Sequence, residues 1–87
     1  KLQTYRVQID SLDQQLLRLL NQRAAVAQRI GALKHQFGLP VRVPAREVQV
    51  VQNVQQRNTG PLPNDALDRL WQLIIAEMRA LETRHKP

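Results

Sequence analysis

The sequence contains no cysteine, and its 87 residues include one Phe, one Trp and one Tyr. The absence of cysteine excludes disulfides and thiolate metal ligands and fits a reducing compartment, so we expect a cytoplasmic protein. Because aromatic residues are scarce, the hydrophobic core must consist mainly of Leu, Ile and Val. No apolar run approaches the length of a membrane span and no signal peptide is recognisable, so we expect no membrane association.

Motifs for most kinds of catalysis are also missing. The two histidines are isolated and do not have metal-ligand spacing. The sequence has no glycine-rich phosphate loop, and no Ser or Thr lies in the context of a nucleophile motif. We therefore expect neither metal nor cofactor, and charged side chains are what remains to carry any chemistry.

Positive charge is in excess, and the excess is confined to one part of the chain. Thirteen Lys and Arg residues oppose seven Asp and Glu residues, which gives a net charge of +6. Residues 1–60 carry nine basic and three acidic residues, whereas residues 61–87 carry four of each sign. Such an excess suits an anionic partner. Because the basic residues are neither clustered nor interleaved with aromatics, we expect a small carboxylated ligand and no nucleic acid.

Apolar residues recur at helical spacing along residues 2–37, a stretch with no proline and a single glycine. Steps of 3, 4, 3, 7, 4, 3 and 4 residues separate the members of this apolar seam, which are Ile9, Leu12, Leu16, Leu19, Val26, Ile30, Leu33 and Phe37. The pattern predicts one amphipathic helix from about Leu2–Thr4 to Gln36. The step of seven, from Leu19 to Val26, divides into steps of four and three that meet at Arg23, so Arg23 lies within the seam. Its guanidinium there needs an anionic partner, either a carboxylate or a bound ligand.

A short second helix is expected after the first one. Gly38 and Pro40 are typical of a helix C-terminus and of the stop beyond it, so residues 38–44 should form an extended connection. Pro44 suits the first turn of a helix that we place at about Ala45–Arg57.

A third helix is expected after a break rich in Asn, Gly and Pro at residues 58–63. Asn64 or Asp65 should cap it, and it should end near Arg84. Its apolar stripe, flanked by Ile75, consists of Leu67, Leu70, Trp71, Ile74, Met78 and Leu81. Residues 85–87 should be a frayed tail or the start of a linker. The predicted fold class is all-α, with a long, a short and a medium helix in one domain over residues 1–87.

The length of the first helix predicts an assembly. About 34 helical residues span about 50 Å, whereas a compact globule of this size measures roughly 30 Å across. The first helix must therefore extend beyond the rest of the chain, and its apolar seam needs cover from another copy or another protein. We expect a two-fold helical homodimer, with a monomeric coiled-coil fragment as the alternative.

Six charged residues lie on or beside apolar faces of the predicted helices. They are Arg6, Arg23, Lys34, Arg46, Glu47 and Glu82. Each has an ordinary explanation when taken alone. Lys34 and Glu47 complement helix dipoles, and Glu82 at a helix end can reach water. Four cations and two carboxylates on inner faces together indicate a binding site more than a set of coincidences.

The order and spacing of these residues resemble those of the all-helical (AroQ-type) chorismate mutases. The matching stretches cover essentially the whole chain: L-x-x-x-R-x-x-I-D-x-L-D-x-x-L-L-x-L-L-x-x-R at 2–23, V-A-x-x-I-G-x-L-K at 26–34, P-V at 40–41, R-E at 46–47, G-P-L at 60–62 and L-I-I-x-x-x-R-x-L-E at 73–82. The resemblance implies an intertwined helical homodimer with two equivalent sites. It also implies an isomerase that rearranges chorismate to prephenate in aromatic amino acid biosynthesis, without cofactor, metal or covalent intermediate.

The resemblance also implies a role for individual residues. Arg6 and Arg23 would bind the two carboxylates of the substrate, with Arg6 reaching into the partner subunit's site. Helix geometry agrees, because about 40 Å of helix separates Arg6 from Lys34. Lys34 would donate to the ether oxygen and a carboxylate. Glu47 would accept a hydrogen bond from the ring hydroxyl, and Arg46 would add positive potential at the site edge.

Three positions depart from the family's pattern. Val43 replaces an Asp that some members carry, and Met78 replaces a residue that is often small and polar. Glu82 stands where bacterial members often have Gln as a second donor to the ether oxygen. A carboxylate there would repel the developing negative charge and would help only when protonated. The hypothesis that follows is that activity rises as the pH falls.

Alternative functions stay open at this point. Loss of pyruvate from isochorismate, or rearrangement of 4-amino-4-deoxychorismate, would use most of the same cations on the same scaffold. A non-catalytic helical module that dimerises or regulates a fused enzyme is a further alternative. Such a module has no need for buried cations, so Arg6, Arg23, Lys34 and Glu47 together favour an enzyme.

Overall fold

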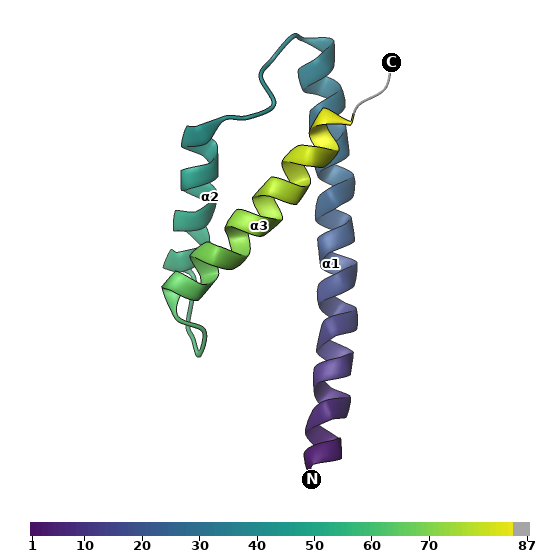
Figure 1. Cartoon of the computed structure of the whole chain (residues 1–87), viewed down its shortest axis with the longest axis vertical. Helices are drawn as coiled ribbons and strands as arrows, with labels where there is room; N and C mark the ends of the chain where they lie inside the picture. The colour runs from purple at the N-terminus through teal and green to yellow at the C-terminus, as the bar shows by residue number, and fades with distance from the viewer. Residues whose placement is uncertain (85–87) are drawn as a thin grey trace.

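The computed structural model describes residues 1–84, and these residues form three α-helices without any strand. Helix α1 comprises Leu2–Gln36, α2 comprises Pro44–Gln56 and α3 comprises Asn64–Thr83 (Figure 1). The predicted all-α order of a long, a short and a medium helix is confirmed, and the predicted ends agree to within a residue or so. The tail expected at 85–87 lies outside the described residues.

A glycine in the left-handed conformation ends α1. Gly38 has a φ of +64°, and the amide of Leu39 donates to the carbonyl of Lys34 at 2.8 Å. This bond is the long one of a Schellman motif, which satisfies a carbonyl that the helix itself leaves free. Lys34 therefore lies in the last turn of α1, directly before the chain reverses toward α2.

The start of α3 differs from the sequence prediction. Pro63 is the N-cap residue, and within residues 1–84 no side chain caps this helix. The expected cap Asn64 instead accepts a hydrogen bond at its Oδ1 from Nδ2 of Asn58, at 2.8 Å. Oδ1 of Asn58 in turn accepts from the amide of Gly60 at 2.9 Å. The prediction of an Asn64 or Asp65 cap was wrong because Asn64 helps to hold the preceding turn.

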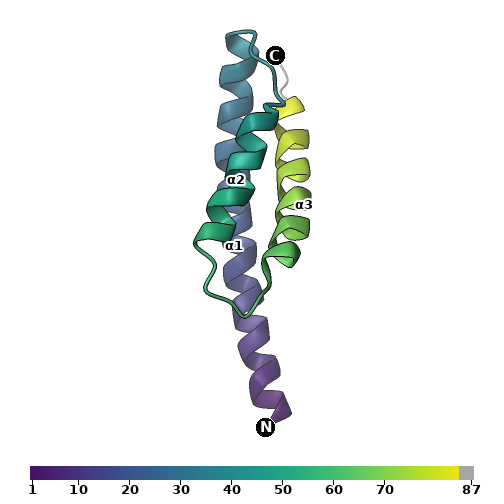
Figure 2. The ribbon, with the colours of Figure 1, turned by 90° about the vertical axis from the view of Figure 1, so that its left-hand side faces the viewer.

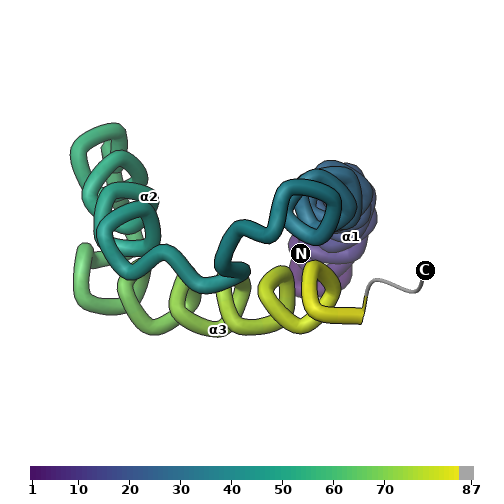
Figure 3. Tube along the Cα trace, turned by 90° about the horizontal axis from the view of Figure 1, so that it is seen from above, coloured from purple at the N-terminus to yellow at the C-terminus, as the bar shows by residue number. Residues whose placement is uncertain are grey.

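Helix α3 packs against both of the other helices. It starts beside the C-terminal end of α2 and crosses obliquely to the C-terminal half of α1 (Figures 1 and 2). Seen along the length of the molecule, α1 and α2 lie on the same side of α3 and are separated from each other (Figure 3). Side chains from all three helices line one cavity.

The core of the single chain is small and follows from this arrangement. On α3, Leu67, Ile75 and Met78 are buried, whereas Leu70 is 45 % exposed. Ile75, expected only at the margin of the stripe, therefore belongs to the core, and Leu70 does not. The reason is that α1 and α2 cover the same side of α3, so the other side of its broad apolar stripe remains open.

The apolar seam of α1 is uncovered in the single chain. Seven of its eight members are more than half exposed, and Ile30 is 42 % exposed. The N-terminal end of α1 projects beyond α2 and α3, and the longest dimension of the molecule is 54 Å (Figure 1). The predicted overhang of the first helix is confirmed. No helix in residues 1–84 combines the length and hydropathy that a membrane span requires.

Candidate active site

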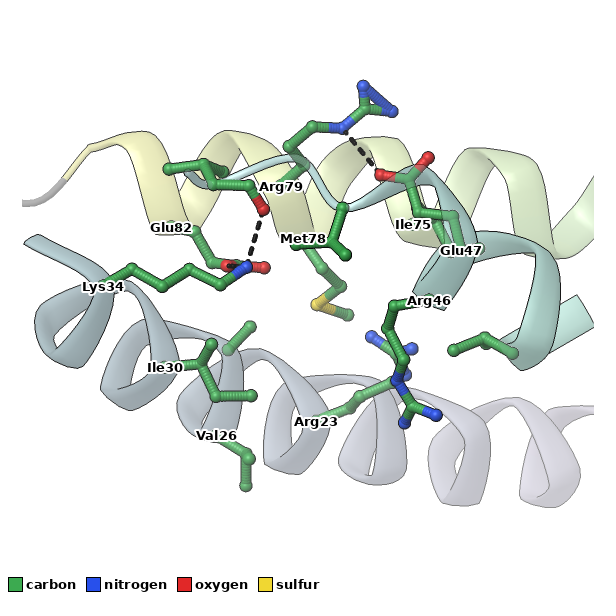
Figure 4. A pocket seen from close by; sticks show the side chains of 14 residues that line it. Arg23, Val26, Ile30, Lys34, Arg46, Glu47, Ile75, Met78, Arg79 and Glu82 are labelled. Carbon is green, nitrogen blue, oxygen red and sulfur yellow. Dashed lines mark hydrogen bonds and ion pairs between the residues drawn. The ribbon is translucent and has the colours of Figure 1, made fainter. Parts of the chain in front are cut away.

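A cavity of about 560 Å³ lies between the three helices (Figure 4). This volume is typical of sites that hold small molecules. Apolar side chains from α1, α2, α3 and the connection at 41–43 form much of its wall: Val26, Ala27, Ile30, Val41, Val50 and Ile75. The cavity also contains seven of the eight residues that the sequence predicts for a site: Arg23, Lys34, Val43, Arg46, Glu47, Met78 and Glu82.

Arg6 is the predicted site residue that does not line this cavity. It lies seventeen residues before Arg23, which corresponds to about 25 Å along the helix axis. That part of α1 projects away from α2 and α3 (Figure 1). A single chain therefore does not bring Arg6 to its own cavity, and its predicted role requires a second copy.

Lys34 and Glu82 meet across the α1–α3 contact. Nζ of Lys34 donates to Oε1 of Glu82 at 2.7 Å and to the carbonyl of Val41 at 2.6 Å. The two side chains are only 19 % and 14 % exposed, so this is a largely buried ion pair. An ammonium group has three hydrogens, and two are used in these bonds. One donor of Lys34 is left for a ligand in the cavity.

A close helix approach at Gly31 brings Glu82 to Lys34. A Cβ atom at Gly31 would lie 2.6 Å from Cα of Glu82 and 2.7 Å from its carbonyl oxygen. Backbone atoms cannot rotate aside as a side chain does, so any larger residue at this position would push the end of α3 away. The glycine in the motif I-G-x-L-K thus sets the distance between the helices that carry the ion pair.

Two guanidinium groups of the cavity lack a carboxylate partner. Among residues 1–84, no carboxylate lies within ion-pair distance of Arg23 or Arg46, whose side chains both extend into the cavity (Figure 4). Nη1 of Arg46 donates to Oε1 of Gln49, a neutral acceptor, at 2.7 Å. Guanidinium donors match the planar geometry of a carboxylate. This end of the cavity is therefore suited to bind an anion.

Glu47 lies in the first turn of α2 and faces two arginines. Its Oε2 is 3.4 Å from Nε of Arg79 on α3, and its Oε1 is 3.7 Å from Nε of Arg42 in the preceding connection. Sequence reasoning did not single out Arg79 as a site residue. The signal was its position three residues before Glu82, which places both on one face of α3.

The charges in the cavity favour a dianionic ligand. Four cations (Arg23, Lys34, Arg46 and Arg79) and two carboxylates line it, so its formal charge is +2. At two of the three positions where the sequence departs from the family's pattern, Val43 and Met78 add apolar surface to the wall. Polar contacts to a ligand must therefore come from the charged residues and the backbone.

The fold and this cavity define a class of protein, namely an all-α domain of three helices with a cation-lined small-molecule site. A family model described as chorismate mutase type II matches residues 5–83 of the 87 residues. The chain therefore belongs to the chorismate mutase type II family. The resemblance inferred from the sequence motifs is confirmed.

Individual relatives support the same family. The structure of chorismate mutase (form II) from Thermus thermophilus matches with a TM-score of 0.94 and 31 % identity, covering 99 % of this chain and 98 % of that chain. A bifunctional chorismate mutase/prephenate dehydratase from Aquifex aeolicus is 37 % identical over 90 residues, which cover 99 % of this chain and 25 % of that relative. A chorismate mutase from Methanocaldococcus jannaschii is 24 % identical over 86 residues, covering 98 % and 87 %. The chain spans about a quarter of the length of the bifunctional relative.

Proposed function

We propose that the chain catalyses the Claisen rearrangement of chorismate to prephenate, as a free-standing enzyme or as the mutase domain of a longer one. The observation that carries the proposal is that three separate helices place Arg23, Lys34, Glu47 and Glu82 around one cavity, in a member of the chorismate mutase type II family. A purely structural module would have no reason to leave guanidinium groups unpaired in a cavity. Residues 1–87 would form a single mutase domain.

The proposed reaction needs positioning and charge stabilisation. Chorismate is a dicarboxylate, and its reactive chair form must be held while one C–C bond forms and the ether C–O bond breaks. Arg23 would bind one carboxylate, and Arg46 would add positive potential beside it. The free donor of Lys34 would bind the ether oxygen, on which negative charge develops in the transition state. Holding the chair form and stabilising this charge lower the barrier without a covalent intermediate.

Two carboxylates complete the proposed site. Glu47 would accept a hydrogen bond from the ring hydroxyl of the substrate and so fix the orientation of the ring. Glu82 lies beside Lys34 and thus close to the ether oxygen. As a carboxylate it opposes the developing negative charge, whereas as a carboxylic acid it can donate a second hydrogen bond to that oxygen.

The active unit that we propose is an intertwined homodimer. The single chain has an accessible surface of 7236 Å², whereas a compact monomer of this mass exposes about 5200 Å². The excess agrees with the uncovered apolar seam of α1, which a second copy would bury. In such a dimer, Arg6 of the partner subunit would supply the second carboxylate-binding guanidinium to each cavity.

The decisive experiment is to incubate the protein with chorismate and identify the product. We expect prephenate as the product. Arg23→Ala should lower kcat/KM by at least about 100-fold, which also excludes a contaminating mutase. Release of pyruvate from isochorismate, or turnover of the amino analogue alone, would move the assignment to those reactions. No turnover of any of the three would favour the non-catalytic module.

A further inference from the structure

We infer that Arg79 is a positioning residue: it fixes the carboxylate of Glu47 for the ring hydroxyl of the substrate without touching the substrate itself. The inference rests on the proposed function, because it assigns Arg79 a part in orienting the same ligand. Arg79 is the arginine of the motif L-I-I-x-x-x-R-x-L-E at 73–82, to which the resemblance assigned no function.

The geometry of the pair carries the inference. Nε of Arg79 is 3.4 Å from Oε2 of Glu47, and the two side chains are 30 % and 18 % exposed. The Nε atom is buried and has no hydrogen-bond partner among the described residues, so its contact with Glu47 is an ion pair. Figure 4 shows the terminal nitrogens of Arg79 directed away from the cavity, while Nε faces Glu47. The charge of Arg79 therefore acts on the ligand through Glu47.

Glu47 needs such a partner because its own side-chain torsion angles do not fix the orientation of its carboxylate. The last torsion of a glutamate side chain is broad, so neighbours must set the plane of the two oxygens. Arg42 faces the other oxygen at 3.7 Å, but its side chain is 64 % exposed, and exposed ion pairs hold geometry weakly. The neighbouring wall residues Val43 and Met78 are apolar. Arg79 is therefore the better-ordered anchor of this carboxylate.

A second explanation makes a different prediction. Arg79 also lines the cavity, so its charge could simply attract a dianionic ligand from a distance. Attraction of that kind would persist after Glu47 is removed. Positioning through Glu47 would vanish, because the group being positioned is gone. The two explanations are separated by a double-mutant cycle between Arg79 and Glu47.

The experiment compares Arg79→Gln, Glu47→Ala and the double variant in steady-state turnover of chorismate. We expect Arg79→Gln to raise KM about tenfold and to change kcat by less than about threefold, because the hydroxyl contact exists in both substrate and transition state. In the Glu47→Ala background the same change should alter KM by less than about twofold. An equal loss in both backgrounds would overturn the inference in favour of simple attraction.

A binding measurement gives a readout that does not depend on turnover. The probes are two stable cyclic dicarboxylates that mimic the chair form, one with the ring hydroxyl and one without it, titrated calorimetrically. Arg79→Gln should weaken binding of the hydroxyl-bearing probe about tenfold and leave the other within about twofold. Equal weakening of both probes would contradict positioning. Equal affinity of the unchanged protein for the two probes would overturn both the hydroxyl role of Glu47 and the inference.

Controls separate charge, folding and function. Arg69→Gln removes the same charge from α3 at an exposed ion pair with Asp65, outside the cavity, and should leave KM unchanged. An Arg79→Gln protein that behaves like Arg69→Gln would refute the inference. If Arg79→Gln does not fold, the cycle is run with Arg79→Lys, for which a KM rise of about threefold, absent without Glu47, is expected. Binding of the probes without turnover of chorismate would overturn the proposed function, while the binding cycle still decides the role of Arg79.

Discussion

Lys34 and Glu82 form an ion pair at the point where the proposed reaction develops negative charge. The pair uses one donor of Lys34 and places an acidic side chain next to the proposed position of the ether oxygen. Removing one partner of a buried ion pair strongly destabilises the protein, because the other charge stays buried without compensation. Replacing Lys34 or Glu82 by an apolar residue would therefore change stability as well as activity. An informative substitution at this pair must therefore keep the hydrogen bond while it removes the negative charge.

Glu82→Gln meets this requirement. The amide oxygen of glutamine can still accept from Lys34, and its NH₂ group offers a donor to the ether oxygen at every pH, whereas glutamate donates only when protonated. We expect Glu82→Gln to raise kcat by about tenfold, because it removes a negative charge beside the ether oxygen and adds a hydrogen-bond donor to it. Glu77→Gln, on the same helix but outside the cavity, is the control and should keep the original kcat. An unchanged or lower kcat in Glu82→Gln would refute this role of the Glu82 carboxylate.

Single residues of the site were predictable where a helical face defines them. Arg23 interrupts the apolar seam, and Lys34 returns to nearly the same face almost three turns later, so both could be placed toward a site from periodicity alone. The bond from Lys34 to Glu82 could not be predicted in this way, because it depends on how closely α1 and α3 approach. The pairing of Arg79 with Glu47 was missed for the same reason, since it joins two helices whose relative orientation only the tertiary structure determines.

At the scale of the helices, the approach of α1 to α3 links packing to the site. Gly31 allows the end of α3 to lie against α1, and the same contact brings Glu82 to Lys34. Glycine within a helix costs stability through its backbone entropy. The sequence therefore accepts a locally unfavourable residue at the position where the two backbones are nearest.

Gly31→Ala tests this link, because the two possible explanations predict changes of opposite sign in the free energy of unfolding. Helix propensity alone would make the alanine variant about 1 kcal/mol more stable. The contact of 2.6 Å with Cα of Glu82 predicts the opposite, a loss of about 2 kcal/mol, because α3 must move. We expect a lower melting temperature and a fall in kcat, since Lys34 loses the bond to Glu82 that holds its ammonium group in the cavity. A more stable variant with unchanged kcat would contradict the proposed dependence of the site on this approach.

Gly38→Ala is the matched comparison for that experiment. At Gly38 nothing lies within 4 Å of the added methyl group, and the cost comes from the φ of +64°. Its stability should fall by about 1 kcal/mol or more, while kcat changes less than in Gly31→Ala. The comparison separates backbone strain at a helix end from displacement of a neighbouring helix.

Local signals at the helix ends explain why the helix bounds were predictable. Gly38, Pro44 and the 58–63 break each act through their own backbone preferences, so they mark the same positions in any tertiary context. The buried stripe of α3 was less predictable, because its apolar residues cover a wide arc and packing decides which of them are used. Ile75 faces the other helices and is buried, whereas Leu70 lies on the open side.

At the scale of the whole molecule, two features of α1 remain unexplained by the single chain. Its apolar seam is exposed over most of α1, and Arg6 lies at the end of that helix farthest from its own cavity. Both features are explained together if a second copy packs along α1 and receives Arg6 into its cavity. A dimer that merely covers the seam would explain the first feature and leave Arg6 without a function.

Mixing two inactive variants distinguishes these two kinds of dimer. Arg6→Ala and Arg23→Ala should each lower kcat/KM by at least about 100-fold, because each site loses one of the two arginines that bind the substrate carboxylates. When equal amounts are unfolded and refolded together, half of the dimers are mixed. In a mixed dimer, the cavity with an intact Arg23 also receives an intact Arg6 from its partner. The mixture should therefore regain about a quarter of the original rate.

The matched control for this experiment is a mixture of Arg23→Ala with Lys34→Gln, whose amide can still donate to Glu82. Both residues line the cavity of the same chain, so one cavity of a mixed dimer lacks Arg23 and the other lacks Lys34. No intact site forms, and this mixture should stay as slow as its components. Arg6 acting within its own chain would likewise leave the first mixture inactive, because neither cavity would then have both arginines. Recovery in the first mixture together with none in the second is expected only if Arg6 crosses between subunits.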